Sequence, residues 1–178
     1  GPSRDAEIIK IELGLADLSQ IEKRRERLKK QIRTSNDAKV EDEALEKIQL
    51  VLEAGGSASS VNLSDESKKL IKPLGLLTAK PIIYATNVAE EDLANGNKYS
   101  DEMVKLAEGE DAEVIRISAQ VESELSDLGE SEQIDYLESL GVQEGGLKSL
   151  IKATYRLLGL RTYFTTGEKE TRAWTIKE

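Results

Sequence analysis

The groups that could do chemistry in this chain are carboxylates, lysines and hydroxyls, because its 178 residues include no histidine and no cysteine. Their absence excludes a disulfide framework, thiolate or Ser-His catalysis, and a zinc site with the usual ligands. Two polar segments occupy suggestive positions. Residues 87–90 and residues 118–120 each follow a short apolar run directly.

Both segments stand at the ends of predicted β-strands. Residues 80–87 and 113–118 are short runs of β-favouring residues, and residues 100–108 between them have helical periodicity. Strand, helix and strand in this order predict a right-handed crossover in a parallel sheet, where ligand sites lie beyond the carboxyl ends of the strands. Taken singly, Asn87 is typical of a turn and Ser118 of a helix cap, so each also has a purely structural explanation.

Taken together, the two segments resemble the paired base-recognition loops of GTPase-like domains, in which the first loop reads Asn-Lys-x-Asp and the second begins Ser-Ala. In that motif the aspartate accepts two hydrogen bonds from guanine. Here Glu90 is one methylene longer, and Val88 replaces the lysine whose stem covers the base. We therefore expect weakened guanine selection and an adenine held by backbone carbonyls, with Asn87 organising the loop and the side chain of Val88 against the ring. The predicted base-contacting residues are Asn87, Val88, Glu90, Ser118, Ala119 and Gln120.

The first third of the chain predicts an antiparallel helical hairpin. Apolar residues recur at helical spacing over residues 5–33, lapse at the polar residues 34–37, and resume over residues 44–52. Within residues 22–33, seven basic residues face only two acidic ones, in a chain of net charge −9. The basic residues are Lys23, Arg24, Arg25, Arg27, Lys29, Lys30 and Arg33.

This basic run has two interpretations that the sequence cannot separate. The residues either pair with acidic residues of the second helix, Glu41, Asp42, Glu43 and Glu46, or contact the phosphates of a nucleic acid with an affinity that falls as salt rises. Further along, residues 67–72, 131–140 and 146–158 read as helices, and two β-rich runs, 161–166 and 170–176, read as a hairpin around a turn at residues 167–169.

Four segments carry a wider resemblance. Residues 15–24, 80–93, 117–125 and 157–176 resemble, in the same order, segments of the YchF family, also called Obg-like ATPases. The resemblance implies a translation-associated P-loop nucleotidase that binds ATP, or GTP less well, with Mg²⁺ and associates with ribosomes through the large subunit or its RNA. It also implies an α/β fold: a partial GTPase-like parallel sheet, an inserted helical hairpin, and the start of a β-grasp TGS domain.

The implied division is a helical hairpin at 1–72, the later part of the nucleotide-binding domain at 73–160, and the first hairpin of a TGS domain at 161–178. The sequence contains neither Gly-x-x-x-x-Gly-Lys-Ser/Thr nor Asp-x-x-Gly, and the family's catalytic histidine is missing. We therefore expect a piece of a longer protein that is inactive alone, with no catalytic or metal-binding residues of its own.

Two more expectations follow from the sequence. A partner, another copy or further chain should cover the apolar strand residues Ile82, Ile83, Val114 and Ile115. No membrane-length or signal-like segment occurs, so a soluble cytoplasmic or organellar protein is expected. The alternative functions are a non-enzymatic module whose basic hairpin docks on RNA or an acidic protein, and an unrelated helical hairpin joined to a small α/β domain.

Overall fold

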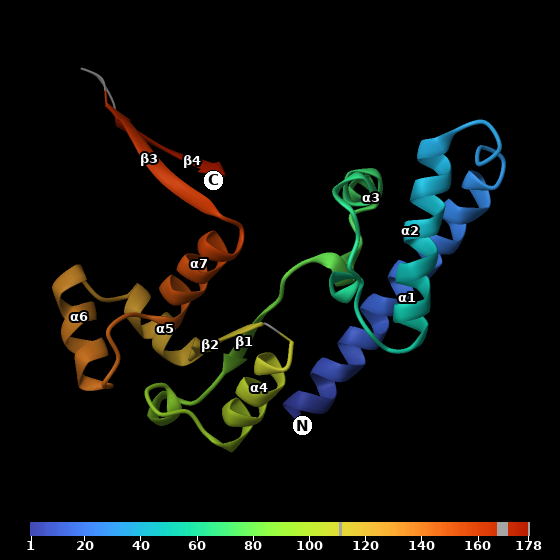
Figure 1. Cartoon of the computed structure of the whole chain (residues 1–178). Helices are drawn as coiled ribbons and strands as arrows, with labels where there is room; N and C mark the ends of the chain where they lie inside the picture. The colour runs from blue at the N-terminus through green and yellow to red at the C-terminus, as the bar shows by residue number, and fades with distance from the viewer. Residues whose placement is uncertain (111, 167–170, 178) are drawn as a thin grey trace. The chain divides into compact units, whose positions relative to one another are not determined.

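The computed structural model describes residues 1–110, 112–166 and 171–177. They form two compact units, one over Ser3–Pro81 and the other from Ile82 onward. The first unit is helical, and the second contains the parallel sheet and the carboxyl-terminal hairpin (Figure 1). The expected α/β class is therefore confirmed. No helix in the described part of the chain is long and apolar enough to cross a membrane.

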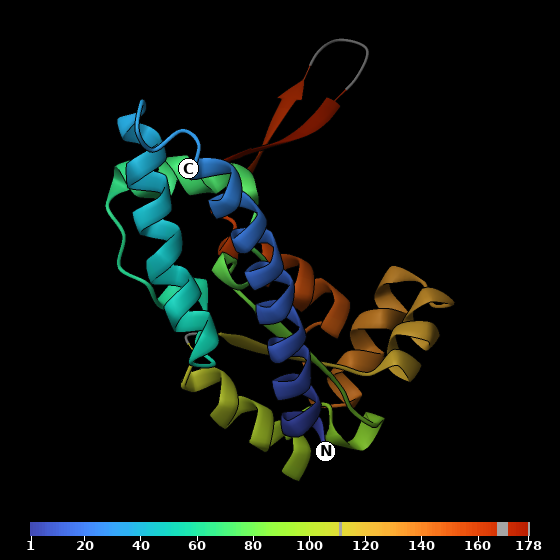
Figure 2. The same cartoon turned by 90° about the vertical axis from the view of Figure 1, so that its right-hand side faces the viewer.

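The first unit is built on two antiparallel helices, α1 (Pro2–Leu28) and α2 (Asn36–Glu53), which lie side by side in both views (Figures 1 and 2). Ser35 starts α2 by accepting a hydrogen bond from the Ala38 N–H, as an N-cap should. Apolar side chains from both helices form the buried core: Ile21, Leu28, Ala38, Leu45, Ile48 and Leu52. The helix predicted to reach residue 33 ends at Leu28, because the chain reverses there and Ile32 packs back onto this core.

Short helices continue the first unit beyond the hairpin. They are η1 (Ala58–Ser60), α3 (Asp65–Ile71), η2 (Lys72–Leu74) and η3 (Leu77–Ala79). A buried carboxylate ties the last of them to α1. Asp17 accepts hydrogen bonds from the Leu77 N–H at 2.8 Å, the Thr78 N–H at 2.8 Å and the Thr78 hydroxyl at 2.7 Å. The compact unit consequently extends to Pro81. The division into domains at residues 72 and 160 stays a prediction.

The second unit begins with the predicted crossover. Strand β1 (Ile83–Asn87) pairs in parallel with β2 (Glu113–Ile117), and α4 (Lys98–Glu108) connects them after the short η4 (Glu90–Asp92). Helices α5 (Ala119–Ser126), α6 (Glu130–Ser139) and α7 (Gly146–Leu157) follow. A buried cluster joins the loop after β1 to α5 and α6: Val88, Leu93, Val121, Leu125 and Leu137.

A β-hairpin follows α7. Strands β3 (Leu160–Thr166) and β4 (Thr171–Lys177) are antiparallel, with Leu160 opposite Lys177 and Thr166 opposite Thr171. The two predicted strands are therefore present. The turn predicted at residues 167–169 lies outside the described residues.

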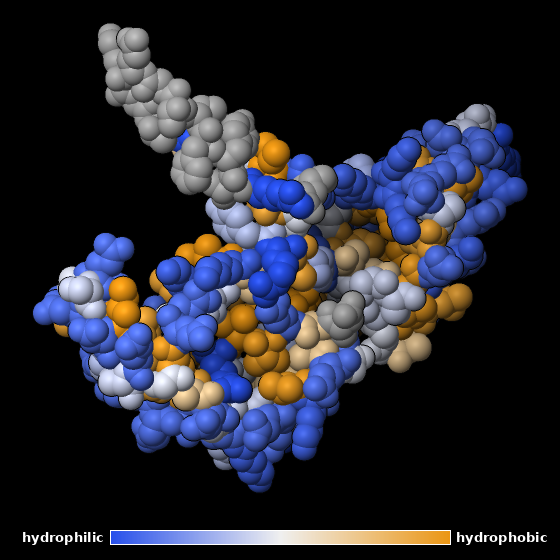
Figure 3. All heavy atoms as spheres, turned by 60° about the vertical axis from the view of Figure 1, so that its left-hand side comes forward, coloured by the Kyte–Doolittle hydropathy of each residue, from blue (hydrophilic) through white to orange (hydrophobic). Residues whose placement is uncertain are grey.

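Several apolar side chains of the second unit remain accessible. Those on α7 and at its C-cap recur at helical spacing, with 52% of Leu147, 51% of Ile151 and 47% of Leu158 exposed. Hydrophobic atoms lie among hydrophilic ones on the face shown in Figure 3. Among the described residues β1 and β2 form a two-stranded sheet, in which Val114 and Ile115 are half-buried. That something further covers these strands stays a prediction.

We expect a tyrosine of the sheet to titrate at high pH. Burial and a 2.8 Å hydrogen bond from its hydroxyl to Glu110 raise the pKa of Tyr84 to about 12. Because the neutral phenol is the favoured form, its stabilising effect is complete below about pH 10 and is lost as the pH rises towards 12. Titration of phenolate absorbance should lose one ionisation near pH 12 in Tyr84→Phe. The exposed Tyr99→Phe serves as the control, and a Tyr84→Phe titration identical to wild type would contradict the expectation.

Candidate functional site

The two polar segments after β1 and β2 are joined by a direct hydrogen bond. The Ala119 N–H donates to Oδ1 of Asn87 over 3.1 Å, and the Val88 N–H donates to the carbonyl of Ile117 over 2.9 Å. This follows from the register of the parallel strands, in which Asn87 stands opposite Ile117. The two segments therefore lie together at the carboxyl edge of the sheet, where parallel α/β folds hold ligands.

Ser118 and Val88 are buried next to this edge of the sheet and help to hold its loops in place. Ser118 is 1% exposed, and its hydroxyl accepts the Val121 N–H at 3.5 Å, so it acts as the cap of α5. Val88 is 7% exposed and packs in the cluster with Leu93, Val121 and Leu125. The side chain of Val88 is therefore largely buried against protein, and its packing against a base stays a prediction.

The exposed residues of this edge are Asn87, Ala119 and Gln120, with Glu90 half-buried nearby. Gln120 donates from Nε2 to Glu124 over 3.1 Å, and the Tyr136 hydroxyl of α6 donates to the other oxygen of Glu124. The carboxylates of Glu124 and Glu90 raise the pKa of Tyr136 to about 12, chiefly through the hydrogen bond to Glu124. The same bond, with that from Gln120, lowers the pKa of Glu124.

Glu124 and Tyr136 were not predicted as site residues. The i, i+4 spacing of Gln120 and Glu124 is visible in the sequence, but such pairs are common on helix surfaces. Tyr136 belongs to a helix whose packing on α5 depends on the buried apolar residues, so only the fold reveals that it contacts Glu124.

The first turn of α7 is seated against the end of β2. Gly146 is buried, and a Cβ there would lie 2.6 Å from the carbonyl oxygen of Arg116 and 2.8 Å from Cα of Ile117. From the other side, the carboxylate of Glu122 accepts the Leu147 N–H at 3.1 Å, which satisfies a free amide of the helix start. The strand end that leads into Ser118 is thus held by a close backbone contact that only glycine permits.

The basic residues of the hairpin divide into paired and unpaired groups. Arg24 makes two hydrogen bonds of 2.6 Å to Glu41, and Arg25 contacts Asp42 at 2.9 Å and Glu46 at 3.0 Å. These carboxylates raise the pKa of both arginines. The pairing interpretation is therefore confirmed for Arg24 and Arg25, because carboxylates of α2 neutralise them. That these two residues contact RNA stays a prediction.

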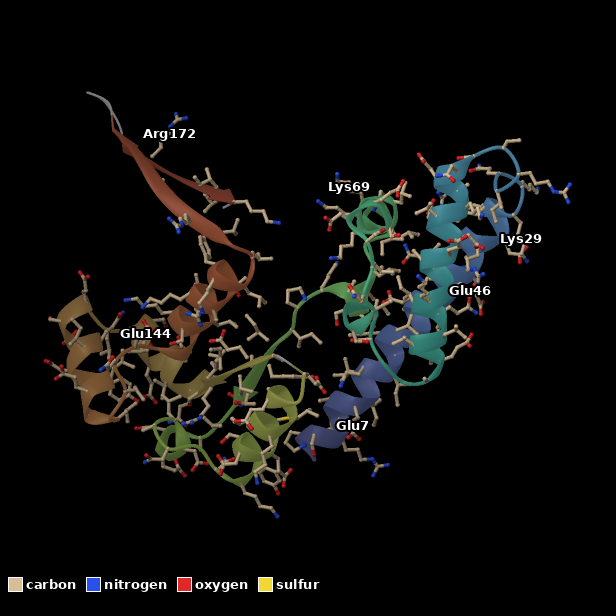
Figure 4. All side chains as sticks on the ribbon, viewed as in Figure 1. Glu7, Lys29, Glu46, Lys69, Glu144 and Arg172 are labelled. Atoms are coloured by element: carbon tan, nitrogen blue, oxygen red, sulfur yellow. The ribbon has the colours of Figure 1, made fainter. Side chains whose placement is uncertain are left out.

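The other five basic residues lie toward solvent. Lys29, at the end of α1, pairs with Glu26 of the same helix, and Figure 4 shows it apart from Glu46 on α2. The remaining four are exposed and have no ion-pair partner within residues 1–110, 112–166 and 171–177: Lys23, Arg27, Lys30 and Arg33. The end of the hairpin thus carries uncompensated positive charge.

The chain is similar in sequence to curated proteins and in fold to a solved structure. No protein-family model matches it. Proteins named ribosome-binding ATPase YchF are 47% identical in Bacillus subtilis, over 99% of this chain and 49% of that protein, and 45% identical in Haemophilus ducreyi, over 98% and 48%. The solved structure of the Schizosaccharomyces pombe YchF GTPase has a TM-score of 0.87 and 33% identity, over 99% of this chain and 49% of that one.

The fold match therefore defines an α/β protein of the GTPase-like fold class. Within that class, the chain belongs to the YchF family. It spans about half the length of the curated relatives it matches.

Proposed function

We propose that this chain is the base-recognising segment of a ribosome-associated ATPase that prefers ATP to GTP. The observation that carries the proposal is the 3.1 Å hydrogen bond from Ala119 to Asn87, which unites the two loops. The name that the relatives bear, ribosome-binding ATPase, supports the ribosomal association and the nucleotide. In this proposal Asn87, Glu90, Ala119 and Gln120, with the backbone of Val88 and the capping Ser118, form the base site.

The preference for ATP has a chemical basis in these residues. Position 88 offers no lysine stem to cover a base, because the residue there is a buried valine. Glu90 stands where a guanine-reading aspartate would be. A site without its full set of guanine acceptors loses the strong discrimination that such sets provide. Backbone carbonyls of the two loops remain to accept the exocyclic amine of adenine.

Hydrolysis requires groups that this segment does not supply. Its sequence has no phosphate-cradling glycine-rich motif with lysine and serine or threonine. In the described part of the chain, no group of three or more acidic residues could hold a metal ion. We therefore assign base binding alone to the segment, with Mg²⁺ and phosphate chemistry belonging to the whole protein.

Asn87→Ala is the test of the base site. It should weaken ATP binding by this chain about tenfold, because it removes the acceptor that joins the loops. Binding is measured by titrating ATP into isotope-labelled protein and following backbone NMR shifts, which report even millimolar dissociation constants. The exposed Asn62→Ala, in the other unit, is the matched control. A wild-type chain whose loop signals do not respond to ATP would contradict the proposal, as would an unchanged affinity in Asn87→Ala.

The four unpaired basic residues support the ribosomal part of the proposal, and also the alternative of a docking module without enzymatic duty. We propose that Lys23, Arg27, Lys30 and Arg33 contact RNA phosphates, whereas Arg24 and Arg25 hold the hairpin together. Because the two groups of residues are given different roles, RNA contact and hairpin stability, replacing one group at a time can test the proposal.

Replacing the four unpaired residues by glutamine should weaken ribosomal RNA binding and reduce the slope of log affinity against log salt by about three, as expected for four lost phosphate contacts. Filter binding at several salt concentrations measures this slope. Glutamine at the exposed Lys69, Lys72, Lys98 and Lys105 gives the same change in net charge as a control. Equal slopes for the two variants would show that the hairpin makes no specific phosphate contacts.

A further inference from the structure

The side-chain amide of Gln120 stands at the joined loops with one end already engaged. It follows Ala119, whose N–H is bound by Asn87, and its Nε2 donates to Oε1 of Glu124 over 3.1 Å. The other carboxylate oxygen of Glu124 accepts the hydroxyl of Tyr136. These three side chains of α5 and α6 thus form a short hydrogen-bonded series, whose first member, Gln120, directly follows the joined loops.

These two hydrogen bonds fix which way the side-chain amide of Gln120 faces. An ionised carboxylate only accepts hydrogen bonds, and the two donors on Glu124 lower its pKa and keep it ionised. The amine end of Gln120 must therefore face Glu124, which leaves the carbonyl oxygen on the opposite side. The hydroxyl of Tyr136 supports this orientation, because it also donates to Glu124 and so leaves the carboxylate as the acceptor of both bonds.

We propose that Gln120, oriented by Glu124 and Tyr136, is a specificity-determining residue that favours adenine through the group at position 6 of the purine. Adenine carries an amine donor there, which the free carbonyl oxygen of Gln120 accepts. Guanine and hypoxanthine carry a carbonyl oxygen instead, which meets that oxygen as one acceptor against another. Glu124 and Tyr136 act as positioning residues. This inference rests on the proposed nucleotide site and names the side chain that discriminates within it.

The preference predicted here differs from the one attributed to Glu90. Glu90 replaces a residue that reads the ring N–H and the 2-amine of guanine, whereas Gln120 reads position 6. Inosine lacks the 2-amine but keeps the 6-carbonyl, so comparing adenosine with inosine excludes any effect of the 2-amine. Adenosine and inosine also lack phosphates, so their binding does not depend on a phosphate cradle.

The experiment is an NMR titration of the full chain with adenosine and with inosine. Wild type should bind adenosine about fivefold more tightly than inosine, the size expected for one hydrogen bond near the surface. Glu124→Gln should bring the two affinities to within twofold, because a glutamine at 124 can donate as well as accept and lets the amide of Gln120 turn over. Gln120→Leu should do the same. Tyr136→Phe should lower the preference less than these two variants do, because the bond from Gln120 to Glu124 remains while the bond that holds the other oxygen of Glu124 is lost.

Glu138→Gln is the matched control, because Glu138 is an exposed glutamate of α6 and the charge change is identical. It should keep the fivefold preference. A wild type that binds neither nucleoside would overturn the proposed nucleotide site, and the inference with it. A wild type that prefers adenosine, with the same preference in Glu124→Gln and Gln120→Leu, would overturn the inference and leave the nucleotide site standing.

Discussion

Replacing Asp17 by alanine is expected to lower the free energy of unfolding of the helical unit by about 3 kcal/mol. Asp17 is completely buried and accepts three hydrogen bonds from Leu77 and Thr78. Alanine leaves two backbone N–H groups inside the protein without an acceptor, and this desolvation is the main cost. Asp17→Asn, with a single acceptor oxygen, should lose about half as much.

Hydrogen exchange assigns this loss to the correct unit, since two units need not unfold together. The amide protons of Leu77 and Thr78 should exchange much faster in Asp17→Ala, and those of β1 and β2 at the wild-type rate. Glu12→Ala, an exposed position on the same helix, should change stability by no more than about 0.5 kcal/mol. Unchanged protection of Leu77 and Thr78 in Asp17→Ala would refute the assigned role.

Gly146→Ala is the second substitution with a large expected effect. Its Cβ would lie 2.6 Å from a backbone oxygen and 2.8 Å from a backbone Cα at the end of β2, and neither atom is free to turn aside. The start of α7 and the strand end must separate, at a cost of about 2 to 3 kcal/mol. Because Ser118 and Ala119 follow that strand end, ATP binding should weaken as well.

The control for this substitution has the opposite expected sign. Gly14 lies within α1, and a Cβ there meets nothing within 4 Å. Gly14→Ala should therefore stabilise the chain by about 1 kcal/mol through helix propensity alone. Thermal and denaturant unfolding of both variants measure the contrast. A Gly146→Ala variant as stable as wild type would mean that α7 is not seated as described.

Much of the fold was predictable because hydrophobic periodicity is a local signal. The apolar spacing along α1 and α2 predicted a hairpin, and the runs before Asn87 and Ser118 predicted two parallel strands. The end of α1 at Leu28 was not predictable, because residues 29–33 are equally compatible with a helix. The reversal of the chain there goes with the packing of Ile32 on the core that α1 and α2 share.

The candidate site was predictable only in part. The positions of Asn87 and Ser118 after strands predicted that these two loops lie together, and the register of the sheet joins them. The burial of Val88 was not foreseen, and ion pairing divides a basic run whose members look alike in the sequence. Asp17 gave no signal at all, since its partners are 60 and 61 residues away. Each miss concerns a residue whose environment is set by tertiary contacts.

The paired arginines of the hairpin fix the alignment of α1 against α2. Sliding α1 past α2 by one turn, about 5.4 Å, would separate Arg24 from Glu41 and Arg25 from Asp42 at once, so the two arms keep a single alignment. With α1 about 40 Å long, the hairpin acts as a stiff rod that holds its unpaired cations at a set reach. If the basic end of such a rod is bound and turned, the other end of the hairpin must turn through the same angle, because the two helices move as one rigid body.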